Sequence, residues 1–253
     1  MTRFEPGTFQ PHPQRASVWT MARAQGLIES KLMLRHGEQQ LLSIVIPLAM
    51  LIGAARMEHI TGHGLKQIFP MVLAVAATSS GFTGQAIALA FDRRYGALKR
   101  TGASGVPAWT IIVGKIAAVF SMVAVQVLVL GGVAFLLGLR VSLGGILLGF
   151  ITLILGVCAF TALGLLLGGT LSSEVVLAVA NLIWFILMGV VGWAMYTQGL
   201  SNDGILTVVP TVAMASALAD ALNHTFPWQE LLVLLAWAGA ASFAAVRWFR
   251  FEG

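Results

Sequence analysis

This 253-residue chain contains few charged residues for its length and only one cysteine. Only 10% of its residues are charged, whereas a soluble domain carries about 25%. With so little charge the chain cannot coat a water-soluble globule, which excludes a soluble enzyme as well as a disordered or fibrous chain. Its single cysteine, Cys158, stands in an apolar run, so neither an internal disulfide nor a cysteine metal site is available.

Apolar residues supply 58% of the chain, and the mean hydropathy is +0.88. A helix needs roughly 17–25 apolar residues to cross a bilayer. Six runs come near or above that length: 41–57, 68–91, 109–139, 143–168, 175–197 and 229–246. None of them alternates apolar and polar residues as a membrane β-strand does. Because only helices and closed barrels satisfy the backbone in lipid, the sequence predicts an all-α polytopic membrane protein with six transmembrane helices.

Lysine and arginine indicate how the chain is oriented in the membrane. Eleven of the fifteen lie before the first run, between the second and third, or after the last; three lie on the other side, at Arg56, Lys66 and Arg140. By the positive-inside rule both termini are cytoplasmic, in a plasma (inner) membrane. The net charge of +5 is then a topology signal, and we expect no nucleic-acid partner. The remaining cation, Lys115, lies inside the third run and is expected to extend toward the cytoplasmic surface.

The chain before the first run divides into a polar tail and a helix. Between residues 17 and 35 apolar side chains recur near helical spacing, at Val18, Met21, Ala22, Ile28 and Leu32. This pattern favours an amphipathic helix on the cytoplasmic face of the membrane, with Trp19 at headgroup depth. The alternative is that the first span extends into water. We therefore divide the chain into a cytoplasmic tail with an interfacial helix, 1–35, and a membrane domain, 36–253.

The connection before the last run, residues 201–229, is only partly polar. Pro210 opens an apolar stretch of about 15 residues, too short to cross the membrane, and Pro227 closes the region. We expect a re-entrant hairpin, which enters the membrane and leaves it on the same side.

The loop 92–107 carries four basic residues, one acidic residue and a Gly/Ser-rich turn before Pro107. Residues 92–100 are enough for about two helical turns, so we expect there a short helix that protrudes from the membrane and docks on another protein. The alternative is a solvated basic loop that only obeys the positive-inside rule. A second cytoplasmic break, Ser172-Ser173-Glu174, has the pattern of a helix N-cap, and its second possible role is contact with a cytoplasmic partner.

Polar side chains inside the predicted spans either mark a transport path or bond neighbouring helices to one another. The candidates for the path are Thr78, Ser79, Thr83, Gln85, Gln126 and Asn181. None of them is charged, which argues against a carrier driven by protons. Interhelical hydrogen bonding is the alternative for the same residues. The pairs Gly145/Gly149 and Gly164/Gly168 have the small-xxx-small spacing that allows close helix packing.

The chain shows no pattern of its own for catalysis or cofactor binding. Gly114-Lys115 differs from a phosphate-binding loop, because Trp109 stands where the motif has glycine and Ile116 where it has serine or threonine. His59 and His63 have i, i+4 spacing, but glycines around them weaken a helix there, so we expect no metal site. We therefore expect no ATP hydrolysis and no other enzyme activity from this chain.

Two stretches resemble the membrane subunits of type-2 ATP-binding-cassette (ABC) permeases, which export drugs, lipids and polysaccharides. The segment after that family's second span is matched by FDRRYGALKRTGASGVPAWTIIVGKIAA, residues 91–118, with its charged pair, Gly-x-Leu, basic residues, proline turn and Gly-Lys. The region of the fourth and fifth spans is matched by LGLLLGGTLSSEVVLAVANLIWFILMG, residues 163–189. The likeness covers residues 36–250. The family often has glutamate where Asp92 or Arg94 stands here, which alters the docking contact but not the class.

The resemblance implies a half-transporter of six helices, moved by a separate ABC ATPase subunit that binds ATP and Mg²⁺. The coupling contact that it implies involves Asp92, Arg93, Arg94, Tyr95, Leu98, Lys99, Arg100, Thr101, Ser173 and Glu174. A second copy or a paralogue would complete the transporter within the lipid. The implied function is export of a hydrophobic or amphipathic substrate: a drug, an antibiotic or a lipid. A membrane enzyme acting on lipid and a scaffold subunit without transport activity are the alternatives.

Overall fold

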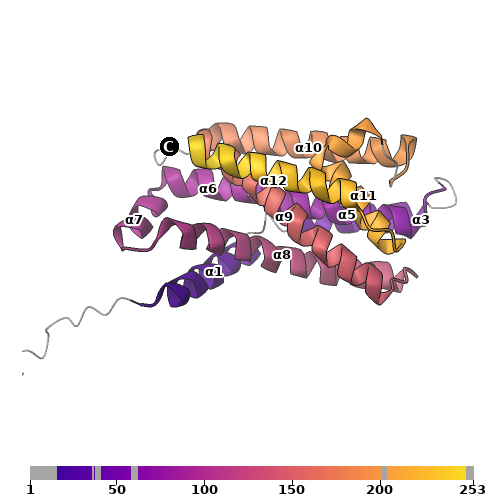
Figure 1. Ribbon diagram of the computed structural model, residues 1–253, viewed down its shortest axis with the longest axis horizontal. Helices are drawn as coiled ribbons and strands as arrows, with labels where there is room; N and C mark the ends of the chain where they lie inside the picture. Colours follow the sequence, from indigo (N-terminus) through magenta and orange to yellow (C-terminus); the bar gives the residue numbers. More distant parts are fainter. Residues whose placement is uncertain (1–15, 36, 38–40, 58–61, 201–203, 249–253) are drawn as a thin grey trace, which may run out of the picture.

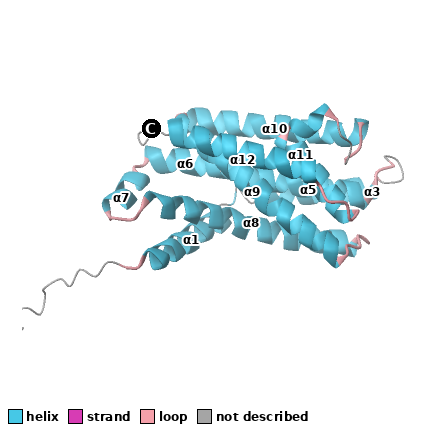
Figure 2. Ribbon diagram, viewed as in Figure 1, coloured by secondary structure: helices cyan, strands magenta, loops and turns pink. Residues whose placement is uncertain are grey.

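The computed structural model describes residues 16–35, 37, 41–57, 62–200 and 204–248, which are nearly all helical and include no strand (Figure 2). The longer helices lie side by side as an elongated bundle (Figure 1). In chain order the elements are α1 (Val18–Arg35), η1 (Leu41–Val45), α3 (Ile46–Arg56), α5 (Leu65–Thr78), η2 (Ser79–Gly84), α6 (Gln85–Arg94), α7 (Ala97–Ala103), α8 (Ala108–Leu136), α9 (Leu143–Thr170), α10 (Ser173–Thr197), η3 (Ile205–Val208), α11 (Pro210–Leu222) and α12 (Trp228–Trp248). Of these, η1 and η2 are π-helical, and η3 is a 3₁₀ helix.

Within these described residues, five helices are long and apolar enough to cross a membrane: Leu65–Arg94, Trp109–Leu136, Leu143–Thr170, Ser173–Thr197 and Trp228–Trp248. They coincide with the second to sixth apolar runs, so the prediction of an all-α protein with membrane-length helices is confirmed. The first run, 41–57, forms a shorter apolar helix, Ser43–Arg56. At 1.5 Å per residue this helix is roughly 20 Å long, which is less than the ~30 Å hydrocarbon core.

The centre of the bundle is one long helix, formed by α5, η2 and α6 end to end. Over its most apolar stretch 83% of the residues are buried, against 22% for α10 and 17% for α12. The π-helical turn Ser79–Gly84, with the sequence SSGFTG, interrupts its middle. Such a turn disturbs the regular ladder of backbone hydrogen bonds and leaves carbonyl groups accessible to side-chain donors.

Two glycines of α9 bring that helix against the backbone of the central helix. A Cβ atom placed on Gly164 would lie 2.6 Å from the carbonyl oxygen of Phe82, and one on Gly168 would meet the backbone of Ala86. Any larger residue at these positions would push the helices apart. The close packing predicted from the spacing of Gly164 and Gly168 is therefore confirmed.

The helix before the last one, α11, lies inside the bundle. α11 is buried along nearly its whole length, from Pro210 onward. Met214, near the beginning of α11, lies against Gly156 in the middle of α9, whereas Ala221, near its end, lies against Gly145 at the start of α9. α11 therefore runs from about the middle of α9 back toward the end at which α9 begins.

α1 packs lengthwise on the first half of α8 (Figure 1). Gly26 of α1 lies close to Ala117, and Ser30 Oγ lies 3.0 Å from Ser121 Oγ. Large apolar side chains remain exposed on α1, namely Trp19, Leu27, Ile28 and Leu32. The helix predicted between residues 17 and 35 is thus present, with one face against α8 and apolar side chains elsewhere on its surface.

The two ends of the bundle differ in charge. At one end α6, α9 and α12 finish while α8 and α10 begin, and α7 lies there, at the left of Figure 1. This end, which we call the basic end, carries Arg93, Arg94, Lys99, Arg100 and Arg247. The opposite end carries Arg56, Lys66 and Arg140.

Candidate functional site

α7 protrudes from the basic end, between α6 and α8 (Figure 1). None of its seven residues is buried. Gly96, at φ +67°, takes the left-handed conformation that glycine adopts without strain, so the chain turns sharply from α6 into α7. Arg100 closes the turn, because its Nη1 donates a hydrogen bond to the Tyr95 carbonyl oxygen at 2.7 Å. A short helix is present in this loop, but over Ala97–Ala103 and not over the predicted 92–100, because Asp92–Arg94 continue α6 and the chain turns at Gly96.

The protruding segment presents a small surface of aromatic, aliphatic and cationic side chains. We call it the α7 surface, and its exposed or half-buried residues are Tyr95, Leu98, Lys99, Arg100 and Thr101. Tyr95 is 64% exposed and stacks on Phe91 of α6, with ring centroids 5.9 Å apart. The stack holds the aromatic ring at the root of α7, where it is available to another protein.

Three consecutive residues at the end of α6 reach three different neighbours. Successive residues of an α-helix point about 100° apart, so Asp92, Arg93 and Arg94 leave α6 in three directions. Asp92 accepts a hydrogen bond from Lys115 of α8, with Oδ2 and Nζ 2.7 Å apart. The root of α7 is thereby tied to the helix that follows it in the chain.

Arg93 is directed toward α9. Its side chain is buried, and its Nη1 donates to the carbonyl oxygens of Gly168 at 2.8 Å and Leu171 at 2.9 Å. These carbonyls lie at the end of α9, where intrahelical donors run out and the helix dipole is negative. The guanidinium therefore caps α9 and holds it to α6, and it does not belong to the exposed α7 surface.

Arg94 joins α6 to the start of α10. Its Nη1 donates to Ser173 Oγ at 3.2 Å and forms an ion pair with Glu174. Both charged side chains are largely exposed, so the pair sets geometry more than it adds stability. Ser172 occupies the predicted N-cap position of α10, but its side chain makes no capping hydrogen bond. The structure thus brings together the two loops that the sequence marked separately.

Lys115 is buried, which shows that the expected extension toward the membrane surface is wrong. Only 1% of its side chain is exposed, and its Nζ lies 3.4 Å from Glu29 Oε2 as well as 2.7 Å from Asp92 Oδ2. Gln25 supports Glu29 with a hydrogen bond of 2.9 Å. Two carboxylates thus compensate a charge that is costly to bury alone. No local pattern reveals this triad, because its carboxylates lie 23 and 86 residues from Lys115.

The six residues predicted as a possible path lie in two kinds of surroundings. Five are buried inside the chain: Thr78, Ser79, Thr83, Gln85 and Gln126. The sixth, Asn181 on α10, is half-buried, and its Nδ2 donates to the Leu177 carbonyl of its own helix at 2.9 Å. The role of these six side chains as a substrate path stays a prediction.

Gln126 of α8 joins the two π-helical segments. Its Nε2 donates to the carbonyl oxygens of Ser43 at 3.0 Å and Ala76 at 3.1 Å, and to Ser80 Oγ at 2.6 Å. Trp184 of α10 adds a hydrogen bond of 3.3 Å to the neighbouring Val75 carbonyl. These contacts are hydrogen bonds between helices, which is the alternative interpretation of the polar residues in the spans.

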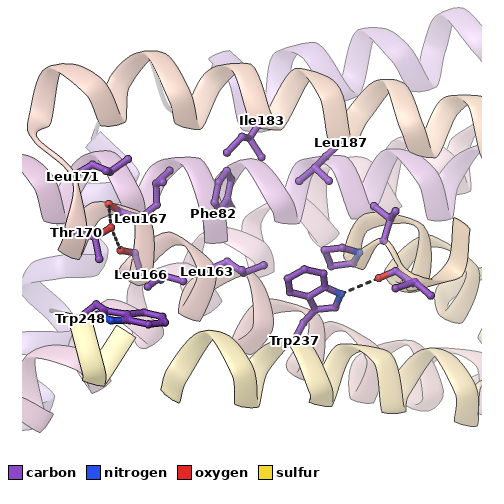
Figure 3. A pocket seen from close by; sticks show the side chains of 13 residues that line it. Phe82, Leu163, Leu166, Leu167, Thr170, Leu171, Ile183, Leu187, Trp237 and Trp248 are labelled. Atoms are coloured by element: carbon purple, nitrogen blue, oxygen red, sulfur yellow. Dashed lines mark hydrogen bonds between the residues drawn. The ribbon is translucent and has the colours of Figure 1, made fainter. Parts of the chain in front are cut away.

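An apolar groove of about 860 Å³ lies between α10 and α12, over α9 (Figure 3). Phe82, several leucines and two tryptophans line it, and none of the six predicted path residues does. Trp237 and Trp248 are eleven residues apart, about three turns of α12, so they face the groove together. The spacing of the two tryptophans is the feature of the sequence that indicates the groove. Its other walls come from separate apolar runs.

The histidine pair noted in the sequence is described only in part. His63 Nδ1 lies 2.8 Å from Gln67 Oε1, and its ring meets Tyr196 edge-on at 4.8 Å. His59 lies outside the described residues. Among the residues that are described, no group of three or more His, Cys, Asp or Glu side chains is placed to hold a metal.

Long apolar helices around a buried centre define a polytopic helical membrane protein. Residues 38–247, most of the chain, match the family model of the ABC-2 family transporter proteins, so this chain belongs to that family. The resemblance seen in residues 91–118 and 163–189 is thereby confirmed. No curated protein matches the chain.

Proposed function

We propose that this chain is the membrane-spanning permease subunit of an ATP-driven exporter, and that the α7 surface docks on a separate ATPase subunit. The observation that carries the proposal is the anchoring of the root of α7: Asp92, Arg93 and Arg94 bind α8, α9 and α10 respectively. A force applied to α7 therefore reaches several membrane helices at once and is not lost in bending a loose loop.

The residues implied by the family resemblance then divide into two groups with different tasks. The anchor has its contacts within the chain and consists of Asp92, Arg93, Arg94, Ser173 and Glu174. The α7 surface makes the contact with the ATPase. The ATPase binds ATP and Mg²⁺, and the permease itself hydrolyses nothing.

The proposal also orients the chain. The basic end faces the cytoplasm, in agreement with the positive-inside rule, so both termini are cytoplasmic and the protein lies in the plasma (inner) membrane. The run 41–57 provides the sixth crossing: α3 ends at the opposite end with Arg56, and a bilayer that thins locally accommodates the short helix. α11 forms a re-entrant hairpin, and α1 begins at the cytoplasmic surface with Trp19 at headgroup depth and runs beside the first half of α8.

Export of a hydrophobic or amphipathic substrate, such as a drug, an antibiotic or a lipid, agrees with the apolar surfaces of the bundle. The complete permease contains two copies of this chain, or this chain and a paralogue. One face of α10 supports such pairing, because it exposes large apolar side chains at helical spacing: Leu182, Phe185, Ile186 and Trp193.

The docking claim is tested by reversing one charge on the α7 surface. We expect Lys99→Glu to reduce co-purification with the ATPase subunit by about tenfold, since a close like charge at a contact costs roughly 1.4 kcal/mol or more. Substrate transport into vesicles falls with it. Lys66 is an exposed lysine at the opposite end, so Lys66→Glu is the matched control. It is expected to retain both association with the ATPase subunit and substrate transport. Wild-type association in Lys99→Glu contradicts the proposal.

Exchanging the charges of the anchor separates its task from docking. Arg94→Glu and Glu174→Arg each place like charges together, so each is expected to uncouple ATP hydrolysis from transport while the ATPase stays bound. The double variant restores the ion pair and with it the coupling. If the double variant is as defective as Arg94→Glu, Arg94 touches the ATPase directly and the division into anchor and α7 surface is wrong.

A further inference from the structure

The groove between α10 and α12 covers only half the depth of a membrane. It extends from Trp248, in the last turn of α12, to Trp237, about 16 Å along the helix at 1.5 Å per residue. Beyond Trp237, η3 and the start of α11 close it, and Trp237 Nε1 donates to the Val208 carbonyl at 2.8 Å. Figure 3 shows Trp248 beside Thr170 at one end and Trp237 at the other. Since the hydrocarbon core is ~30 Å thick, the groove spans about one leaflet.

The side chains that line the groove offer almost no hydrogen-bonding groups to water. Its floor is made by Phe82 and by leucines of α9, such as Leu163 and Leu166. Its one hydroxyl, that of Thr170, already donates to the Leu166 carbonyl of its own helix at 2.8 Å. Cavities lined in this way stay dry, so a groove of about 860 Å³ at the lipid boundary is a site for an apolar ligand.

The open end of the groove, by contrast, is cationic. Arg247 precedes Trp248 and is exposed, and the buried Arg93 bonds to Leu171, which also lines the groove. Tryptophan is enriched at the level of lipid headgroups, the depth at which Trp248 then stands. A ligand with an apolar chain and an anionic group at one end matches both parts of the site.

We propose that the groove binds one anionic phospholipid of the leaflet at the basic end, with an acyl chain along α9 and the phosphate beside Arg247. A helix of a second copy is a poorer occupant, because a spanning helix needs about 30 Å of depth and η3 closes the groove at the middle. The proposal can be tested apart from the coupling function, since the phosphate lies beside Arg247, which belongs neither to the anchor nor to the α7 surface.

The site is tested by counting lipids on the purified full chain. The chain is reconstituted with equal amounts of phosphatidylglycerol and phosphatidylcholine, washed in mild detergent and examined by native mass spectrometry. We expect one retained phosphatidylglycerol. Leu166→Trp, which fills the groove, is expected to lower its retention about tenfold. Leu147→Trp makes the same change at an exposed position of the same helix, outside the groove, and is expected to retain the lipid.

A second variant tests the charge without altering the packing. Arg247→Gln is expected to lower the preference for phosphatidylglycerol over phosphatidylcholine about fivefold, as one basic residue near an anionic lipid surface allows. Lys66→Gln at the opposite end leaves the preference unchanged. Retention of detergent only, equal retention in Leu166→Trp and Leu147→Trp, or an unaltered preference in Arg247→Gln each overturns the proposal.

Discussion

The central helix, formed by α5, η2 and α6, and the outer helices α10 and α12 are all apolar enough to cross a membrane, but they are built in opposite ways. The central helix is mostly buried and carries small and polar residues. The outer helices are mostly exposed and carry large apolar side chains, such as Phe185 and Phe243. Lipid tails are as apolar as leucine, so large side chains gain little by turning inward.

The comparison teaches what holds such a bundle together. Close backbone approach at Gly164 and Gly168, hydrogen bonds from Gln126 and the ion pairs of Lys115 all converge on the central helix. A substitution at any of these residues removes a contact between helices, so it should lower the free energy of unfolding. Changes on the outer helices should matter far less to stability, and three substitutions measure the difference.

The largest effect is expected from Gly168→Leu. The added side chain would meet the backbone of Ala86, which cannot give way as a flexible side chain can. Overpacking costs about 1–3 kcal/mol and occasionally more, and we expect a loss of stability at the upper end of that range. The loss is measured as a lower midpoint of thermal unfolding in detergent. Gly189→Leu on α10 is the control, because nothing lies within 4 Å of its Cβ position. Equal losses in the two variants would contradict the comparison.

The next effect in size is expected from Lys115→Met. The change leaves Asp92 and Glu29 as neighbouring carboxylates without their cation. Breaking a buried ion pair costs about 3–5 kcal/mol, and we expect about 2 kcal/mol here because both carboxylates are partly exposed. Thermal unfolding measures the loss, and adding Asp92→Asn should recover part of it. Lys66→Met serves as the control at an exposed position, and a Lys115→Met protein as stable as wild type would rule out the triad as a structural element.

The smallest measurable effect is expected from Gln126→Leu. It removes the hydrogen bonds that join η1, α5 and η2, and such bonds in membrane proteins contribute about 0.6 kcal/mol on average. We expect about 1 kcal/mol, because three acceptors lose the same donor together. Asn181→Leu is expected to change the free energy of unfolding hardly at all, since Asn181 bonds within its own helix. The comparison fails if Asn181→Leu is the more damaging of the two.

Much of the fold could be predicted because a membrane helix is a continuous local pattern. Five apolar runs became membrane-length helices, and the apolar stretch after Pro210 became the buried α11. The run 41–57 was harder to interpret, because it is short and contains Pro47; it forms the shorter helix Ser43–Arg56, and its crossing of the membrane stays a prediction. The π-helical turn in SSGFTG was missed, although its glycines and serines are typical of such irregularities.

One part of the candidate site could likewise be predicted from the sequence, and the rest could not. The protruding α7 could be predicted from neighbouring residues, since Gly96 and the basic residues around it lie within one loop. The anchor could not, because Arg93 and Arg94 bind partners that lie 75 to 80 residues further along the chain. The groove could not either, because its walls come from α9, α10 and α12 and only folding brings them together.

The docking of α7 on an ATPase is tested most directly by photo-crosslinking in membranes that contain both subunits. A photoreactive residue at Tyr95, on the α7 surface, is compared with one at Lys66, at the opposite end. The account predicts a covalent adduct with the ATPase from position 95, changing in yield when ATP is added, and none from position 66. An adduct from position 66 alone, or none from position 95 while the subunits co-purify, would contradict it.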